Sequence, residues 1–270
     1  MTSPNALLRA WNIRADKRLG QNFLTDPSTA AKIVAHAEIT DNDIVLEIGS
    51  GLGALTIPAA RLAARVYAVE KDSRLLDLLK TELLANNITN TILLNKNILQ
   101  VDIPAFTAPS GRKLIVLGNL PYNISTPLIF HILENPDCIK DMHFMLQKEV
   151  VDRIVSAPGS KHYGRLSVML QAYCSAQYLF EVPPHAFQPA PKVDSAILRL
   201  VPGTPFEDQI DEFSDFENLV RQAFSQRRKT LKNTLKSICG ADRIERAGLE
   251  ISQRAEELSI ADFVSLYRSV

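Results

Sequence analysis

The sequence predicts an α/β fold followed by a small domain made only of helices. Short apolar runs alternate with amphipathic helical patterns over most of the chain, the alternation stops near residue 176, and a helical tail follows. Alternating strands and helices are typical of a parallel sheet with helices on both faces. The 270 residues, of which 46% are hydrophobic, are enough for one sizeable core and a small second one.

The first part of the chain carries the alternating elements. After a basic N-terminal arm, an amphipathic helix is predicted around residues 28–37. The runs that follow alternate between strand and helix patterns, and they are DIVLEIG, ALTIPAARLA, RVYAVE, SRLLDLLKTELLANN, TILLN, KLIVLGN, PLIFHILEN and MHFMLQ. This order predicts successive βαβ units.

The last third of the chain has a different pattern. AQYLFEV and SAILRL are strand-like and are joined only by PPHAFQPAPKVD, so we expect an antiparallel hairpin at the edge of the sheet. VPGTPF is predicted to be a linker, which places the two domains at residues 1–203 and 204–270. Within the second domain, FENLVRQAFSQRRKTLKNTLKSI is predicted to form one helix, and DRIERAGL and IADFVSLYRS further helices.

Composition and charge restrict the class of protein. The 30 basic and 30 acidic residues cancel, so an acidic partner must be recognised by a local basic patch. Cys138, Cys174 and Cys239 are far apart and odd in number, which favours a reducing compartment, the cytoplasm, over a disulfide framework. The histidines show no metal spacing, so no metal site is predicted.

The chain shows no sequence signal for a membrane. No apolar run approaches the roughly 18 residues that span a bilayer. The N-terminal arm lacks the apolar core of a secretory signal, and it carries two arginines before its first acid, Asp16. An organelle-targeting segment therefore remains the minor alternative to a plain basic arm.

A glycine-rich turn follows the first strand pattern in IVLEIGSGLGALTIPAARL. Such a turn lets the backbone approach a ligand closely. Gly49, Gly51 and Ala54 satisfy the dinucleotide pattern G-x-G-x-x-A, and Glu70 lies at about the expected distance downstream. A nicotinamide-dependent oxidoreductase is therefore one alternative, and a tight turn that binds nothing is another.

Two carboxylates favour a different cofactor. Glu47 lies two residues before the first glycine and gives E-x-G-x-G, which suits a ligand with a cationic amino-acid end better than one with a pyrophosphate. Glu70 ends the next strand pattern in AVEKD, where a carboxylate can take both ribose hydroxyls. The pairing resembles the S-adenosyl-L-methionine site of class I methyltransferases.

The stretch GNLPYNIST adds residues suited to holding a flat amine. In class I methyltransferases that act on a planar nitrogen, a sequence of the type Asn/Asp-x-Pro-Tyr ends the fourth strand, beside the transferable methyl group. The side-chain oxygen of Asn119 and a backbone carbonyl at Leu120 or Pro121 can accept both N–H bonds of such an amine, and Tyr122 can lie against the ring. Proline constrains the direction of the carbonyl because its φ is fixed. The alternative is an ordinary strand-to-helix turn in which the tyrosine packs inward.

Together these stretches resemble one family over roughly residues 14–268. KRLGQNFLTD, LEIGSGLG, AVEKD, GNLPYNIST, PPHAFQPAPKVDSAILRL and FSQRRKTLKNTL are similar to the ribosomal RNA adenine dimethyltransferases, the KsgA group, with the Erm methyltransferases as relatives. The resemblance implies a Rossmann-like class I methyltransferase domain with a small C-terminal helical domain. It also implies transfer of methyl groups from S-adenosyl-L-methionine to N6 of two adjacent adenosines in small-subunit (16S) ribosomal RNA.

The resemblance also implies a role for individual residues. The expected cofactor-binding residues are Asn22, Leu24, Glu47, Gly49, Gly51, Glu70, Asn97 and Asn119. The expected catalytic residues are Asn119, Leu120, Pro121, Tyr122 and Phe187. Phe187 would stack on the far face of the target adenine; the alternative is a core aromatic, and we expect the surrounding prolines to make that loop stiff and hard to bury.

Asn97 departs from the family pattern. The family's usual segment resembles G-D-A-L, whereas this chain has KNIL, so Asn97 stands where an aspartate normally accepts a hydrogen bond from the cofactor's adenine. Losing the charge should weaken binding by on the order of 1 kcal/mol. Asp102 is a poorly aligned substitute.

Two basic segments are expected to bind RNA. QRRKTLKNTLK contains five cations and no acid, and Arg228, Lys232 and Lys236 would share one face of a helix. The expected RNA-binding residues are Arg14, Lys17, Arg18, Arg227, Arg228, Lys229, Lys232 and Lys236. The alternative is a solvated helix face. RNA would be recognised by its shape and backbone, with the target adenosine flipped into the pocket.

The expected partner is ribosomal RNA of the small subunit within a pre-ribosomal particle, bound by a monomer in the cytoplasm. A rival hypothesis is a binding protein of the same fold, a ribosome-assembly or transcription factor whose methyl transfer is dispensable. An Asn119→Ala variant separates the two, because an assembly role predicts normal subunit binding and rescue of maturation without methylation.

Overall fold

The computed structural model describes residues 4–121 and 124–270. The chain divides into two compact units, one of residues 1–148 with 178–202 and the other of residues 149–177 with 203–270. The domain boundary expected between residues 203 and 204 lies one residue from the last division along the chain, 202/203. Residues 149–177 group with the C-terminal segment, so the division at 203/204 stays a prediction.

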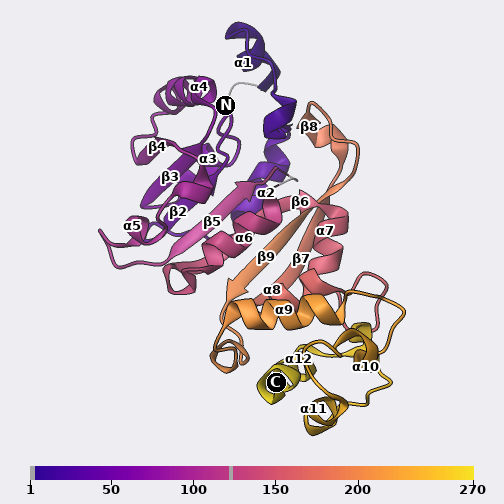
Figure 1. The fold of residues 1–270 in the computed structure, drawn as a ribbon. Helices are drawn as coiled ribbons and strands as arrows, with labels where there is room; N and C mark the ends of the chain where they lie inside the picture. Colours follow the sequence, from indigo (N-terminus) through magenta and orange to yellow (C-terminus); the bar gives the residue numbers. More distant parts are fainter. Residues whose placement is uncertain (1–3, 122–123) are drawn as a thin grey trace. The chain divides into compact units, whose positions relative to one another are not determined.

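A seven-stranded sheet forms the centre of the first unit (Figure 1). Its strand order is β4-β3-β2-β5-β6-β9-β7. The bounds are β2 Ile44–Ile48, β3 Arg65–Glu70, β4 Thr91–Asn95, β5 Leu114–Asn119, β6 Ile139–Gln147, β7 Cys174–Val182 and β9 Ser195–Pro202. The first five of these in the order are parallel neighbours, β9 runs antiparallel to β6, and β7 forms the edge. The predicted α/β class is confirmed.

The strand register brings three chain segments to one edge of the sheet. Ile48, near the end of β2, pairs with Val69 of β3 and with Gly118 of β5. Glu70 and Asn119 are therefore the next residues of their strands, level with the glycine-rich turn that follows β2. The chain moves outward from β2 to β4 and then returns to β5 on the other side of β2. In open α/β sheets, ligands bind at the carboxyl ends of the strands at such a reversal.

Helices cover the sheet. Their bounds in this unit are α1 Pro4–Ala10, α2 Pro27–His36, α3 Thr56–Ala60, α4 Ser73–Ala85, α5 Pro104–Thr107 and α6 Ser125–Leu133. Asp26 caps α2 by accepting from the backbone N–H groups of Ser28 and Thr29, the donors that a helix start leaves unpaired. One face of the sheet shares a core with α2 and α3, which contains Val45, Val66, Ile115 and Leu117 from the strands.

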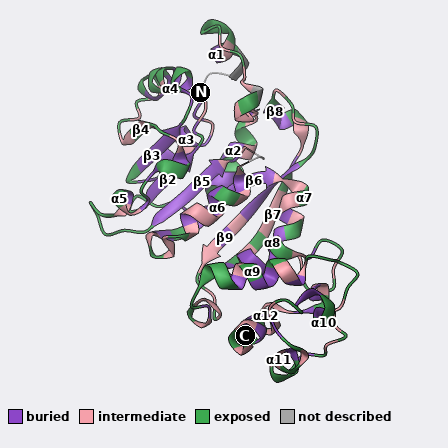
Figure 2. Ribbon diagram, viewed as in Figure 1, coloured by how far each residue is buried: buried purple, intermediate pink, exposed green. Residues whose placement is uncertain are grey.

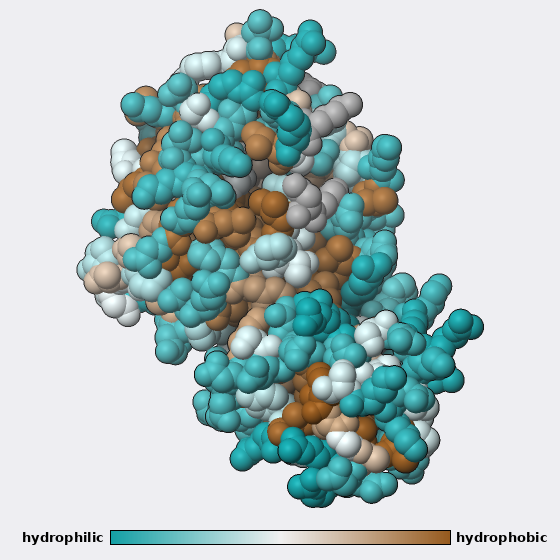
Figure 3. All heavy atoms as spheres, viewed as in Figure 1, coloured by the Kyte–Doolittle hydropathy of each residue, from teal (hydrophilic) through white to brown (hydrophobic). Residues whose placement is uncertain are grey.

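The side chains follow the pattern expected of a parallel sheet. All five residues of β2 are buried, because strands covered on both faces carry continuous apolar runs. The inner strands β2, β3, β5 and β6 are accordingly mostly purple in Figure 2, whereas β4 and β7 are largely pink or green. Hydrophilic side chains cover most of the face shown in Figure 3. Among the described residues, none of the helices has the length and apolarity that a bilayer crossing requires.

A second, two-stranded ladder ties the N-terminal segment to the proline-rich loop. β1 (Phe23–Leu24) and β8 (Phe187–Gln188) pair antiparallel, with Leu24 opposite Phe187. Thr25 continues the contact, since its N–H donates to the carbonyl of Ala186 at 2.8 Å. The sequence pattern did not predict this pairing.

The second unit is helical apart from the start of β7. Its helices are α7 Lys148–Ile154, which starts at the last residue of the first unit, and α8 Arg165–Tyr173, α9 Phe213–Ala223, α10 Leu231–Thr234, α11 Ala241–Arg246 and α12 Ile260–Ser269. Phe224 stacks on Phe263 with ring centroids 5.7 Å apart, and Phe216 meets Tyr267 edge-on. The hydroxyl of Tyr163 donates to the carbonyl of Leu258 at 2.8 Å and so joins the two segments of the unit.

The single helix predicted over residues 216–238 is wrong. α9 ends at Ala223, residues 224–230 form turns, and α10 is a separate four-residue helix. The first N–H groups of α10 donate outside the helix, Leu231 to Gln253 and Lys232 to Ile251. These long-range bonds satisfy donors that a continuous helix would have bonded internally, so Arg228, Lys232 and Lys236 do not share one helix face.

Candidate functional site

A cavity of about 230 Å³ opens at the carboxyl ends of β2, β3 and β5. Four segments surround it: residues 18–24, which we call the strap, the glycine-rich turn, the end of β3 with Lys71, and residues 96–99. Leu75, Asn119, Pro121 and Ile124 complete the lining. All eight expected cofactor-binding residues line this one cavity.

Glycine is required in the turn beside this cavity. Gly49 and Gly51 have φ of +73° and +52°, in the left-handed region that other residues rarely adopt. The N–H of Gly49 donates to the carbonyl of Val69 at 2.8 Å, which anchors the turn to β3. A Cβ at Gly51 would lie 3.4 Å from the ring of Phe23, an ordinary van der Waals contact, so the positive φ and not the space calls for glycine there.

Glu70 presents a fixed carboxylate to the cavity. Its two oxygens accept from the backbone N–H of Gly51 at 2.9 Å and of Asp72 at 2.8 Å. Burial raises the pKa of Glu70, and the two backbone N–H groups oppose that effect because they stabilise the charged form. Each oxygen keeps a further lone pair with which to accept a ligand hydroxyl.

Glu47 is a second carboxyl group at the cavity, and it is only 2% exposed. Thr56 Oγ1 donates to its Oε2 at 2.5 Å. The pKa of Glu47 is raised to about 8, mainly by burial and also by the nearby charge of Glu70, while the Thr56 hydrogen bond opposes the shift. A cationic ligand group beside it would favour the ionised form.

The side chain of Asn119 has a fixed orientation. Its Nδ2 donates to the backbone carbonyl of Asn22 at 2.8 Å. A carbonyl can only accept, so the nitrogen must face it and Oδ1 must point elsewhere. No donor to Oδ1 is found within residues 4–121 and 124–270. Asn119 therefore offers an open acceptor at the end of β5.

A second open acceptor follows directly. The carbonyl of Pro121 accepts from Ile124 at 3.1 Å, whereas no described residue donates to the carbonyl of Leu120. The Leu120 side chain itself is 1% exposed and does not line the cavity. A Cβ at Gly118 would lie 2.7 Å from Leu120 Cδ2, so glycine there allows this side chain to pack against the strand end. The sequence did not decide between the carbonyls of Leu120 and Pro121 as the second acceptor. The Leu120 carbonyl is the better placed, because that of Pro121 already accepts from Ile124.

Two aromatic residues were expected at the site. Tyr122 lies outside the described residues. Phe187 is 3% exposed, packs in the core with Leu24 and Ala186, and does not line the cavity. The expectation that prolines keep this loop from burying Phe187 is therefore wrong. Stacking by Phe187 stays a prediction, and it requires the ring to leave this core.

Asn97 lines the cavity, and one lone pair of its side-chain oxygen is already used. It caps the short 3₁₀ turn η2 (Ile98–Gln100), with Oδ1 accepting from the N–H of Leu99 at 3.3 Å. An aspartate would cap with one oxygen and keep the other free, whereas asparagine is left with an N–H₂ group. Asp102 is exposed and is not among the lining residues, so it does not replace the missing oxygen.

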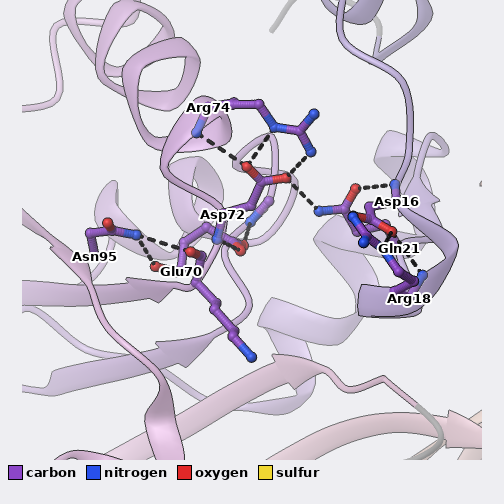
Figure 4. A network of polar contacts seen from close by, with 9 residues as sticks. Asp16, Arg18, Gln21, Glu70, Asp72, Arg74 and Asn95 are labelled. Carbon is purple, nitrogen blue, oxygen red and sulfur yellow. Dashed lines mark hydrogen bonds and ion pairs between the residues drawn. The ribbon is translucent and has the colours of Figure 1, made fainter.

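A polar network beside the cavity was missed at the sequence level. Figure 4 shows Gln21 of the strap between Asp16 and Asp72, and Arg74 against Asp72. Asp72 was detectable as a helix cap, because it precedes the amphipathic run SRLLDLL. Gln21 carried no such signal beyond its place in GQNFL.

The expected RNA-binding cations lie in both units. Arg227, Arg228, Lys229, Lys232 and Lys236 are all exposed, and Arg227 pairs with Glu256 at 3.1 Å. In the first unit, Arg14 is exposed, Arg18 pairs with Asp16, and Lys17 belongs to the 3₁₀ turn η1 (Lys17–Leu19). The RNA-binding role of these residues stays a prediction.

Known proteins are similar to this chain over nearly its whole length. A family model described as ribosomal RNA adenine dimethylase matches residues 12–270. The ribosomal RNA small subunit methyltransferase A of Xylella fastidiosa (strain 9a5c) is 45% identical over 256 residues, which are 95% of this chain and 96% of that protein. 

Solved structures agree with this match. A dimethyladenosine transferase from Plasmodium falciparum has a TM-score of 0.77 at 28% identity, covering 90% of this chain and 95% of that one. The 23S rRNA methyltransferase ErmE has a TM-score of 0.70 at 26% identity, covering 92% and 99%. These matches confirm the resemblance carried by the sequence motifs, and the chain belongs to the ribosomal RNA adenine dimethylase family.

Proposed function

We propose that this protein transfers methyl groups from S-adenosyl-L-methionine to N6 of two adjacent adenosines in small-subunit ribosomal RNA. The observation that carries the proposal is the pair of open acceptors at the end of β5, Asn119 Oδ1 and the Leu120 carbonyl, beside a cavity lined by two buried carboxyl groups. Membership of the family supports the same reaction.

The lining of the cavity fits the proposed cofactor by its chemistry. Glu70 offers two oxygens for ribose hydroxyls, and Glu47 favours a cationic amino-acid end. Asn22 and Leu24 of the strap would close the cavity over the ligand, and Asn97 would face its adenine. When bound, S-adenosyl-L-methionine supplies an electrophilic methyl group.

The two open acceptors solve the difficulty of this reaction. The lone pair of an adenine N6 amine is delocalised into the ring, so the amine is a poor nucleophile and a general base would not improve it. Asn119 Oδ1 and the Leu120 carbonyl accept the two N–H bonds and favour a nitrogen whose lone pair points at the methyl group. Well-oriented reactants gain on the order of 7 to 11 kcal/mol over free ones. Tyr122 would stack on the base, a contact worth roughly 1 to 3 kcal/mol.

The RNA and the particle that carries it are part of the same proposal. The exposed cations of the arm and of residues 227–236 would grip phosphates, and the adenosine would be flipped into the site. We place the reaction on a pre-ribosomal small subunit, carried out by a monomer in the cytoplasm. 

The test uses small subunits that lack the modification. After incubation with the protein and S-adenosyl-L-methionine, mass spectrometry of the ribosomal RNA maps methylated adenines, and we expect dimethylation at N6 of two neighbours. Asn119→Ala should slow the reaction by about 100-fold because the amine is no longer oriented. Asn42→Ala removes an exposed carboxamide and should change nothing.

Other outcomes contradict the proposal in different ways. Unmodified N6 positions with the wild-type protein, despite normal binding to subunits, would favour a protein that acts by binding alone. Heat of binding with NAD and none with S-adenosyl-L-methionine would favour an oxidoreductase. Full activity of Asn119→Ala would refute the orienting role while leaving methyl transfer intact.

A further inference from the structure

Both polar atoms of the Gln21 carboxamide are hydrogen-bonded within the protein (Figure 4). Its Oε1 accepts from the backbone N–H of Asp16 at 2.7 Å, and its Nε2 donates to Oδ2 of Asp72 at 3.0 Å. A backbone N–H needs an acceptor and a carboxylate needs a donor, so only a carboxamide satisfies both partners. A glutamate of the same shape would keep the first bond and set two carboxyl groups against each other.

Asp72 gives this contact a rigid anchor. It caps α4, and Arg74 donates to it from Nε at 2.9 Å and from Nη2 at 2.6 Å. The Asp72 side chain is 5% exposed, and the Arg74 hydrogen bond is the main cause of its lowered pKa. The backbone N–H of Asp72 donates to the Glu70 side chain at 2.8 Å. The anchor of the strap is therefore also bonded to the carboxylate proposed to hold the ribose.

The strap in turn holds Asn119. At its far end, Leu24 pairs with Phe187 in the β1–β8 ladder. Between that ladder and Gln21 lies Asn22, whose carbonyl accepts the Nδ2 of Asn119 at 2.8 Å. If the Gln21 contact were broken, the strap would lose its side-chain bond to the start of α4 but would keep the packing of Phe23 with Leu75 and Leu78 and the β1–β8 ladder. The Asn22 carbonyl would then be held less firmly, and so would the Asn119 amide that donates to it.

We propose that Gln21 is a positioning residue for methyl transfer: its bond to Asp72 holds the strap where the Asn22 carbonyl turns Asn119 Oδ1 toward the substrate nitrogen. The inference rests on the proposed function of Asn119 and goes beyond it. Gln21 lines the cavity, but both polar atoms of its side chain are bonded to Asp16 and Asp72 and are not offered to a reactant. It acts through the strap, and it makes the orientation of the catalytic amide depend on a contact at the start of α4.

The test is a swap of polarity across the contact. Gln21→Glu removes the donor and adds a repelling charge with almost no change of shape. Asp72→Asn in the same chain restores a donor facing an acceptor, and asparagine still caps a helix. Arg74 Nη2, which also donates to Oδ2 of Asp72, must turn away from the new amide nitrogen; the half-exposed side chain can do this while Nε stays bonded to Oδ1. Gln209→Glu, which removes a donor to the carbonyl of Pro205 in the second unit, is the matched control.

The decisive measurement is turnover at saturating cofactor and RNA. We expect Gln21→Glu to lower kcat by about tenfold to 100-fold, the double variant to recover much of the loss, and Gln209→Glu to equal the wild type. A raised KM for the cofactor with unchanged kcat would overturn the proposal, since the strap would then only cover the cofactor. A loss that Asp72→Asn does not relieve would also count against it.

A second measurement does not depend on activity. With ¹⁵N-labelled asparagine, the side-chain N–H₂ signal of Asn119 is assigned by its absence from Asn119→Ala. We expect this signal to shift and to exchange faster with solvent in Gln21→Glu and to return in the double variant. An unchanged Asn119 signal in Gln21→Glu would overturn the positioning role, whether or not the wild-type protein methylates RNA. A shifted signal together with an inactive wild-type protein would contradict the proposed function and leave the positioning role standing.

Discussion

Glu47 carries a carboxyl group that the fold keeps away from water. Burial raises its pKa from 4.5 to about 8. Between these two values the folded protein binds a proton that the unfolded chain releases, so the free energy of unfolding falls as the pH rises through this window. The loss of stability caused by ionising Glu47 is absent below pH 4.5 and complete above about pH 8.

Glu47→Gln tests this linkage. The amide cannot ionise, so we expect the variant without ligand to be more stable than the wild type near about pH 8.5, by on the order of a few kcal/mol, and similar to it near about pH 5. Urea unfolding at both pH values measures the difference. Glu134→Gln, at an exposed position, should follow the wild type. Parallel pH profiles for Glu47→Gln and the wild type would show that Glu47 ionises normally.

Individual residues were predictable where the backbone alone places them. Glu47, Gly49 and Glu70 line one cavity because the ends of parallel strands meet at one sheet edge, which periodicity already implies. Gln21 was not predictable, because its partner Asp72 lies 51 residues away and the contact leaves no pattern in the sequence. The burial of Phe187 was misjudged because it depends on a two-residue ladder with the strap, while its role in stacking stays a prediction.

At the scale of the element, the turn η2 decides what Asn97 can offer. The side-chain oxygen that the cofactor's adenine would need already caps this turn. That oxygen keeps one lone pair, and the other half of the amide is an N–H₂, a donor where the family's aspartate presents a second acceptor oxygen. The departure at position 97 thus changes the polarity of the contact as well as its charge.

Asn97→Asp should therefore improve cofactor binding without changing stability. Asp and Asn cap equally well, so the turn is kept, while a second carboxylate oxygen becomes free to accept. We expect affinity for S-adenosyl-L-methionine to rise on the order of fivefold in isothermal titration, with an unchanged unfolding midpoint. Gln100→Glu adds the same charge at an exposed position of η2 that does not line the cavity. An equal gain from both variants would assign the effect to general charge.

Elements were predicted well where burial is periodic and badly where long-range bonds interrupt a pattern. The continuous apolar run of β5 identified it as a buried strand. The helix expected beyond Ala223 is broken because Leu231 and Lys232 donate to residues 253 and 251. Such bonds join segments about 20 residues apart in the chain, and local propensity carries no information about them.

For the whole molecule, a formal net charge of zero means that attraction to RNA must come from unpaired local cations. In the second unit, residues 218–241 contain no acid. Lys229, Lys232 and Lys236 are exposed there, and no ion pair to a described carboxylate is found for them. Arg153, Arg165 and Arg246 of the same unit differ, because each is paired with an acid, Glu149, Glu217 and Asp242 respectively.

The unpaired lysines should therefore contribute more to RNA binding than the paired arginines. Replacing all three lysines by glutamine should weaken binding to small-subunit RNA. The plot of log K against log salt should also become less steep, by about 2 to 3 units of slope, since each lost phosphate contact removes about 0.7 to 0.9. The triple Arg→Gln control removes the same charge but leaves its acids unpaired. Filter binding over a range of salt measures both. If the two variants lose the same slope, net charge governs binding; a loss confined to the lysine variant locates the phosphate contacts in this segment.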